Sequence, residues 1–193
     1  MIDGNTQIIA HVGYPTHAFK SPMIYNPYFE GAGINAVVVP MGIQAEAYPS
    51  ALRALFQLTN IRGALVTMPH KVTTVGLLDA VTPTVLVAGA CNAVRRDDAG
   101  RLVGDMFDGA GFVRGVRRKG LELRGARALV VGSGGVGCAI AASLAAEGIA
   151  AIGLHDVQAA SAEALAARLR QHYPQLVVGT GSNDPAGYDL VVN

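Results

Sequence analysis

The stretch "ALVVGSGGVGCAIAASLA", residues 128–145, decides the fold class of this 193-residue chain. An apolar, strand-like run leads into Gly132-x-Gly134-x-x-Gly137, and an alanine-rich, helix-like run follows. The first glycine permits a tight turn, the second lets the backbone approach a pyrophosphate, and the third lets helix and strand pack closely. An ordinary tight turn is the alternative. We predict a Rossmann domain whose cofactor-binding residues are Gly132, Ser133, Gly134, Gly135, Val136 and Gly137.

A second apolar run, residues 150–156, ends in Asp156, which lies 24 positions after Gly132 (156 − 132). Roughly 20 residues is the usual offset of the acid that binds the adenosine ribose. A carboxylate there accepts hydrogen bonds from both ribose hydroxyls and repels a 2′-phosphate, so the cofactor expected is NAD rather than NADP. The alternative is that Asp156 only caps the helix predicted over residues 157–173.

The first half of the chain alternates short apolar runs with amphipathic runs. The pattern predicts strands over residues 7–13, 36–43 and 63–69, helices over residues 21–33 and 46–58, and a short helix within residues 70–81. Strand, helix and strand in this order form βαβ units. We therefore expect an α/β protein with an open parallel sheet in its N-terminal domain.

Residues 90–107 contain two strand-like runs around Asp98-Ala99-Gly100, which predicts a β-hairpin. A helix is predicted over residues 109–118, and beyond it the composition shifts to Ala, Val and Gly. We expect a substrate-binding and catalytic domain over residues 1–110 and a Rossmann domain over residues 111–193. The last six residues, "YDLVVN", read as a buried strand. This predicts that the Rossmann domain is truncated at its C-terminus.

Composition narrows the class of partner. A formal net charge of +1 with 15% charged residues provides no basic field for nucleic acid or for a membrane surface. No basic, apolar leader and no apolar run of about 18 residues is present. Cys91 and Cys138 lack metal-ligand spacing and fit reduced thiols. We expect a cytoplasmic protein that binds a small molecule, and the sequence leaves a homodimer open.

Lys71 follows a predicted strand, at the sheet edge where open α/β proteins usually bind ligands. The arms of the hairpin carry Asn92 and Asp108, which could reach the same edge. A lysine beside a carboxylate can exchange a hydroxyl proton while hydride moves to a nicotinamide. The alternatives are a solvated lysine at a helix start and a metal site on Asp105, Asp108 and His70. No metal is expected, because the histidines lack ligand spacing.

Five segments together resemble the shikimate dehydrogenases and their quinate-using relatives. "ALVTMPHK" (64–71) is similar to the family's NVTxPxK, "GACNAV" (89–94) to GAxNT, and "GDMFDGAGF" (104–112) to GDNTDGxGF. The segment of residues 13–40 resembles the family's substrate-binding N-terminus, and "VVGSGGVGCAIA" (130–141) its dinucleotide turn. The resemblance implies an NAD(P)-dependent dehydrogenase that interconverts a secondary hydroxyl and a ketone on a cyclic hydroxy acid.

By matching position, the resemblance implies that Lys71 and Asp108 form the catalytic pair. Thr67 and Asn92 would hydrogen-bond ring hydroxyls of the substrate, and Ser21 would hold its carboxylate.

Two departures from the family pattern bear on the substrate, and a third bears on the cofactor. Phe19 replaces a carboxylate-binding serine, and Met106-Phe107 replaces Asn-Thr beside the catalytic aspartate. We therefore add Phe19 and Met106 to the substrate-binding residues and expect a substrate other than shikimate itself. The segment "HDV" (155–157) stands where NADP-using members carry Asn-Arg-Thr, in agreement with NAD. A ligand-binding relative without turnover remains the alternative function.

Overall fold

The computed structural model describes residues 2–193 and divides into two compact units. The first contains the residues up to Val81 and Cys91–Asp105, and the second contains Thr82–Ala90 and Met106–Asn193. The chain therefore passes between the units three times, after Val81, Ala90 and Asp105, where the sequence suggested one passage near residue 110. The extra passages arise because a short helix ahead of the hairpin packs with the second unit.

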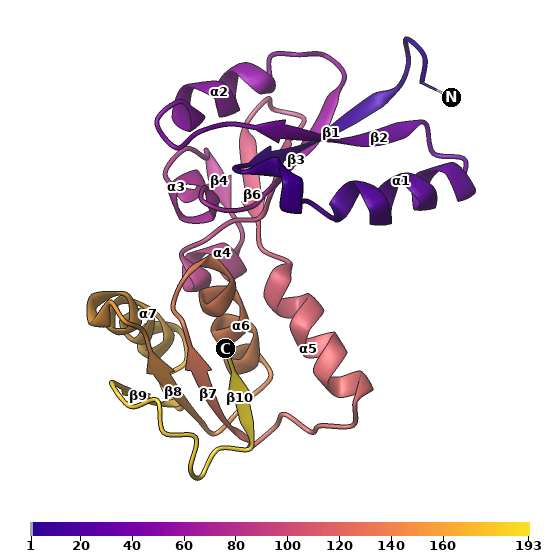
Figure 1. Cartoon of the computed structure of the whole chain (residues 1–193). Helices are drawn as coiled ribbons and strands as arrows, with labels where there is room; N and C mark the ends of the chain where they lie inside the picture. The colour runs from indigo at the N-terminus through magenta and orange to yellow at the C-terminus, as the bar shows by residue number, and fades with distance from the viewer. Residues whose placement is uncertain (1) are drawn as a thin grey trace. The chain divides into compact units, whose positions relative to one another are not determined.

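The first unit is built on three parallel strands (Figure 1): β1 (Gln7–Gly13), β2 (Ala36–Gly42) and β3 (Ile61–Val66). Helix α1 (Ser21–Gly31) connects the first two, and α2 (Tyr48–Leu55) precedes the third. These elements confirm the predicted strands and the first two predicted helices to within a few residues. β1 is the middle strand of these three, and its residues Ala10 and Val12 are fully buried.

The predicted hairpin is confirmed as β5 (Ala93–Arg96) and β6 (Leu102–Asp105), joined through Gly100 at a φ of 80°. β5 pairs antiparallel with β3, and β4 (Ala80–Val81) pairs parallel with β6, giving the strand order β2-β1-β3-β5-β6-β4. The sheet is therefore parallel over its first three strands, as predicted, and mixed beyond them because the hairpin reverses direction.

A short helix was predicted within residues 70–81, and the structure confirms it. α3 (Lys71–Val75) ends at Gly76, and β4 takes up the end of the predicted range. Three further short elements were not predicted: η1 (Thr16–Ala18), α4 (Pro83–Ala88) and β9 (Val177–Thr180). The sequence did carry the signals for α4, because a proline stands at its first position and Gly89 follows its end at a φ of 64°.

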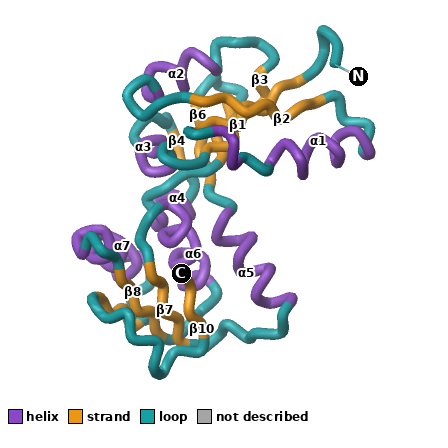
Figure 2. The backbone as a smooth tube through the Cα atoms, in the orientation of Figure 1, coloured by secondary structure: helices purple, strands orange, loops and turns teal. Residues whose placement is uncertain are grey.

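The second unit contains a four-stranded parallel sheet in the order β10-β7-β8-β9 (Figure 2). Its strands are β7 (Arg127–Val131), β8 (Ala151–His155), β9 (Val177–Thr180) and β10 (Leu190–Val192). The helices α5 (Asp108–Arg118), α6 (Gly135–Ala146) and α7 (Ala159–His172) confirm the sequence predictions. α5 and α6 lie side by side, so closely that a Cβ on Gly109 would overlap the carbonyl oxygen of Ala139.

Candidate active site

A cavity of about 380 Å³ lies at the carboxyl ends of β1 and β3 in the first unit. Three of the predicted substrate-binding residues, Phe19, Ser21 and Thr67, line it together. Ligands of open α/β sheets usually bind at this end of the strands. The complete lining comprises His11, Tyr14, Pro15, Ala18, Phe19, Lys20, Ser21, Ile24, Thr67 and Met68.

Backbone hydrogen bonds tie the loops around this cavity to one another. The amide of Tyr14 donates to the carbonyl of Met68 at 2.9 Å, and the amide of Thr67 donates to the carbonyl of Val12 at 2.9 Å. Gly13 lies between the two loops, where a Cβ would come within 2.7 Å of the Met68 oxygen and 2.9 Å of the Phe19 ring. Only glycine allows this close approach, so the packing of the two loops around the cavity requires Gly13.

Lys71 and Asn92 are held near the same strand ends through their main chains. The amide of Cys91 donates to the carbonyl of Lys71 at 2.9 Å, and the amide of Val66 donates to the carbonyl of Asn92 at 2.8 Å. The amide of Asn92 in turn donates to the carbonyl of Asp105 at 3.0 Å. The first unit therefore brings the backbones of Lys71 and Asn92, two predicted site residues, to the carboxyl end of β3, which Thr67 follows.

A buried polar network fixes the start of α3, the helix whose first residue is Lys71. The His70 ring stacks on Tyr48 with centroids 3.9 Å apart, and its Nε2 lies 2.8 Å from the carbonyl oxygen of Ile43. Thr74 Oγ1 donates to the His70 carbonyl at 2.7 Å and lies 2.7 Å from the Tyr48 hydroxyl. Burial raises the pKa of Tyr48 to about 12. The sequence analysis did not identify this network, because its contacts between α2, Ile43 and the start of α3 join residues that are 22 to 27 positions apart.

His11, left without a role by the sequence, lines the cavity. Its side chain is buried, with 6% of the residue exposed, and its ring stacks on Phe19 at a centroid distance of 4.1 Å. Burial, and second the charge of Lys71, lower the pKa of His11, so its imidazole is neutral at neutral pH. Its Nδ1 has no hydrogen-bond partner among residues 2–193. A polar residue in an otherwise apolar strand was the available signal.

The predicted residues of the Asp105–Asp108 segment divide between the units. Asp105 ends β6 in the first unit, whereas Met106 and Asp108 belong to the second. Asp108 is the first residue of α5, where the helix dipole favours a negative charge. Met106 is 2% exposed and Phe107 is 57% exposed, so of the two apolar residues Phe107 carries the accessible surface.

The glycine-rich turn between β7 and α6 fits a dinucleotide pyrophosphate. Gly132 has a φ of 102°, and a Cβ on Gly137 would overlap the carbonyl oxygen of Gly132. Space around Gly134, the N-cap of the twelve-residue α6, is open, so phosphate oxygens could approach the helix N-terminus. Ser133 Oγ is buried without a partner among the described residues. An unpaired hydroxyl beside such a turn is available to a phosphate group.

Asp156 closes this turn against the end of β8. Its Oδ2 accepts a hydrogen bond from the Ser133 amide at 2.6 Å, and its Oδ1 accepts one from the Gln158 amide at 2.8 Å. These bonds lower the pKa of Asp156. Gln158, not Asp156, is the N-cap of α7, so helix capping alone does not describe this residue. A carboxylate has about four acceptor positions, which leaves about two for further donors.

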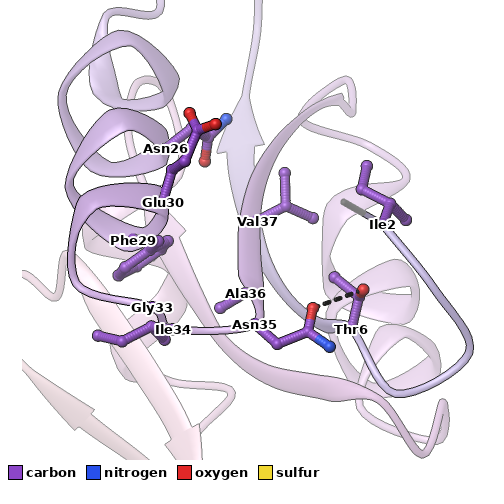
Figure 3. Close-up of a pocket in the computed structure, with 10 residues that line it drawn as sticks. All are labelled: Ile2, Thr6, Asn26, Phe29, Glu30, Gly33, Ile34, Asn35, Ala36 and Val37. Carbon is purple, nitrogen blue, oxygen red and sulfur yellow. Dashed lines mark hydrogen bonds between the residues drawn. The ribbon is translucent and has the colours of Figure 1, made fainter.

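Another cavity, of about 420 Å³, lies between the C-terminal part of α1 and β2 (Figure 3). Asn26, on its wall, uses its side chain to bond both the amide and the carbonyl of Val38, which pins α1 to the edge strand. Thr6 Oγ1 donates to Asn35 Oδ1 at 2.7 Å across the far wall. None of the predicted site residues lines this cavity.

Within residues 2–193, no cluster of three His, Cys, Asp or Glu side chains has a geometry that could hold a metal ion. His70 is engaged with Tyr48 and Ile43, as described above. No helix in the same part of the chain is both long and apolar enough to cross a bilayer.

Comparison with known proteins identifies the family. Residues 12–94 match the family model of the shikimate dehydrogenase substrate binding domain. The shikimate dehydrogenase (NADP(+)) of Geobacter sulfurreducens is 32% identical, over 98% of this chain and 68% of its own length. That of Rhodospirillum rubrum is 33% identical, over 100% of this chain and 70% of its own length. The chain belongs to the shikimate dehydrogenase family.

Solved structures agree. The shikimate dehydrogenase of Aquifex aeolicus superimposes with a TM-score of 0.84 at 29% identity, covering 100% of this chain and 70% of the other. The Listeria monocytogenes enzyme in complex with shikimate and NAD gives 0.85 at 26% identity, covering 93% and 62%. The chain spans 52% of the length of the relative from Rubrobacter xylanophilus and 70% of that from Rhodospirillum rubrum.

Proposed function

We propose that this chain acts as an NAD(P)-dependent oxidoreductase that interconverts a secondary hydroxyl group and a ketone on a shikimate- or quinate-like cyclic hydroxy acid. The observation that carries the proposal is the cavity at the carboxyl ends of β1 and β3, which gathers Ser21 and Thr67 close to the start of α3. The family membership and the glycine-rich turn support the same reaction class.

In this proposal Lys71 exchanges the proton of the reacting hydroxyl, and Asp108 is the second catalytic residue that the family motif implies. An ammonium group can donate a proton to the oxygen of a ketone that is being reduced, and this is the role proposed for Lys71. Ser21 binds the substrate carboxylate, and Thr67 and Asn92 bind ring hydroxyls. A nicotinamide dinucleotide supplies the hydride when it is bound. Gly132, Gly134 and the N-terminus of α6 hold its pyrophosphate.

We propose further that the preferred dinucleotide is NAD. The support is Asp156, whose carboxylate stands at the end of β8 with acceptor positions to spare and would repel a 2′-phosphate. The curated relatives carry NADP(+) in their names, and the Listeria monocytogenes structure contains NAD. Initial rates with each dinucleotide decide between them. Asp156→Asn should reduce any preference for NAD, and an NADP preference in the unaltered protein would refute this part.

The reaction is tested by mixing the protein with shikimate or quinate and either dinucleotide and following the absorbance of the reduced nicotinamide. Lys71→Met keeps most of the side-chain length and removes the ammonium group, and it should lower kcat about 10²- to 10⁴-fold. Lys119→Met, at the C-cap of α5, is the matched control and should leave kcat unchanged. Equal rates for the two variants would refute the role of Lys71.

A second candidate is a ligand-binding relative without turnover. Phe19 on the cavity wall favours it, because a phenyl ring cannot donate a hydrogen bond to a carboxylate. Calorimetric binding of shikimate together with an absence of reduced nicotinamide under all conditions would support this candidate. Turnover that Lys71→Met abolishes would exclude it.

A further inference from the structure

The stacked side chains of His11 and Phe19, here called the His11–Phe19 pair, form one wall of the cavity. Their ring centroids are 4.1 Å apart and their planes are inclined by 28°. The Phe19 ring also reaches Gly13, because its Cζ lies 2.9 Å from the position that a Cβ on Gly13 would take. The pair is therefore a largely apolar surface.

The hydrogen-bonding capacity of this wall is small. Phe19 has no donor, and a neutral imidazole has one donor and one acceptor. His11 Nδ1 lacks a partner among the described residues, although the side chain is more than nine-tenths buried. A rotation of the His11 imidazole by half a turn about χ2 keeps the ring plane that stacks on Phe19. It exchanges the positions of the nitrogen atoms with those of the carbon atoms on the opposite edge. A nitrogen of His11 can therefore be presented to a hydroxyl group in the cavity.

The small number of hydrogen-bond donors on the His11–Phe19 pair also limits which charged groups of a ligand can lie against it. An ionised carboxylate has about four acceptor positions and is costly to bury without donors. The cationic groups around His11 are Lys71, whose charge acts on it, and Lys20, which lines the cavity and is exposed. Ser21 and Thr67 are further donors on the lining. A carboxylate can be satisfied beside those groups but not against the phenyl ring.

We propose that the His11–Phe19 pair determines substrate specificity. The phenyl ring packs against an uncharged, carbon-rich part of a cyclic polyol, and His11 hydrogen-bonds one ring hydroxyl. The pocket accordingly selects a ring whose substituent facing Phe19 is uncharged over one that carries a carboxylate there. This inference rests on the proposed function, because it concerns the substrate of the same cavity.

The test measures binding by calorimetry, independently of turnover, with shikimate and its carboxamide as probes. Because Phe19 and Ser21 line the same cavity, a carboxylate bound by Ser21 also meets the phenyl ring, so the unaltered protein should bind the carboxamide more tightly than shikimate. Phe19→Ser supplies a donor and should shift the affinity ratio at least tenfold toward shikimate. Phe19→Tyr keeps the ring and adds a hydroxyl, so it should shift the affinity ratio in the same direction. This variant tests the role of Phe19 if Phe19→Ser does not fold.

His11 is tested with the same two ligands. His11→Val, which suits the strand, should weaken binding of both ligands about tenfold and leave their ratio unchanged, whereas His11→Gln should restore part of the affinity. His17→Ala, an exposed histidine of η1, is the control and should change nothing.

The outcomes separate the two proposals. Tighter binding of shikimate than of its carboxamide, with a ratio that neither Phe19 variant changes, would overturn the specificity inference. The dehydrogenase proposal would survive that result if shikimate were turned over. Absence of binding by both ligands, with no turnover with either dinucleotide, would overturn both.

Discussion

The buried network of Tyr48, His70 and Thr74 at the start of α3 predicts how much stability each of its hydroxyl groups contributes. Thr74 Oγ1 has one proton, which it donates to the His70 carbonyl at 2.7 Å, so the Tyr48 hydroxyl must be the donor in the second 2.7 Å contact. Thr74→Val preserves the shape of the side chain and removes the acceptor. The Tyr48 hydroxyl is then left buried without this partner, since Tyr48 is 0% exposed. We expect a loss of about 1–3 kcal/mol in the free energy of unfolding.

Tyr48→Phe should cost less. It removes the donor itself, and Thr74 retains its bond to His70, so we expect a loss of about 0.5–1.5 kcal/mol. In the double variant neither hydroxyl remains to be buried unpaired. Its loss should therefore be smaller than the sum of the single losses, with a coupling of about 0.5–3 kcal/mol as found for residues in contact.

Urea unfolding of the four proteins, followed by circular dichroism, measures these differences. The midpoints can be compared when the slopes agree, because equal slopes mean that the same surface is exposed. Ser50→Ala, on the exposed side of α2, is a control that removes a hydroxyl bonded to the Ala47 carbonyl at the surface. Equal losses for Tyr48→Phe and Thr74→Val, together with strict additivity in the double variant, would refute the bonding scheme.

Three further predictions concern other groups. Gly13→Ala should abolish ligand binding in the cavity and lower the thermal unfolding midpoint, because a Cβ there overlaps the loop after β3. Gly111→Ala is the control, and it should change neither ligand binding nor the midpoint, because its Cβ meets open space. The raised pKa of Tyr48 means that the fold favours its neutral form, so this contribution to stability is complete below about pH 10 and is lost as pH rises toward about 12. Tyr48→Phe should flatten that part of a stability–pH curve, and an unchanged curve would contradict the burial of the hydroxyl. Burial raises the pKa of Cys91 to about 11 and also raises that of Cys138, so both thiols should react with a disulfide reagent at pH 8 only after denaturant is added; rapid labelling of the folded protein would contradict this.

Local patterns in the sequence account for most of the elements. The strand at residues 7–13, the glycine-rich turn and the hairpin were all predicted, because each is specified by apolar period or by residues suited to positive φ. The helix α4 was missed although its proline and glycine were visible. The short helix predicted within residues 70–81 is present as α3, which ends at Gly76, and Ala80 and Val81 beyond it pair with β6.

Part of the candidate site was also predicted from the sequence, and part of it depends on the fold. Phe19, Ser21 and Thr67 were expected in the site from the sequence, and they line one cavity because β1 and β3 are neighbours and parallel. His11 received no role, because nothing local to "QIIAHVG" indicates that its ring stacks on a residue eight positions later. Asp156 was identified from its distance to Gly132, but its bond to the Ser133 amide depends on the pairing of β7 with β8.

The sequence by itself determined most of the strands, helices and turns and which residue types stand at the strand ends, because these depend on periodicity and on the conformations that glycine and proline permit. Only the tertiary structure decided that Tyr48, His70 and Thr74 form one buried network and that Phe19 packs against His11. Those contacts join residues of different elements. Strand order and packing decide which elements meet, and no local pattern encodes that choice.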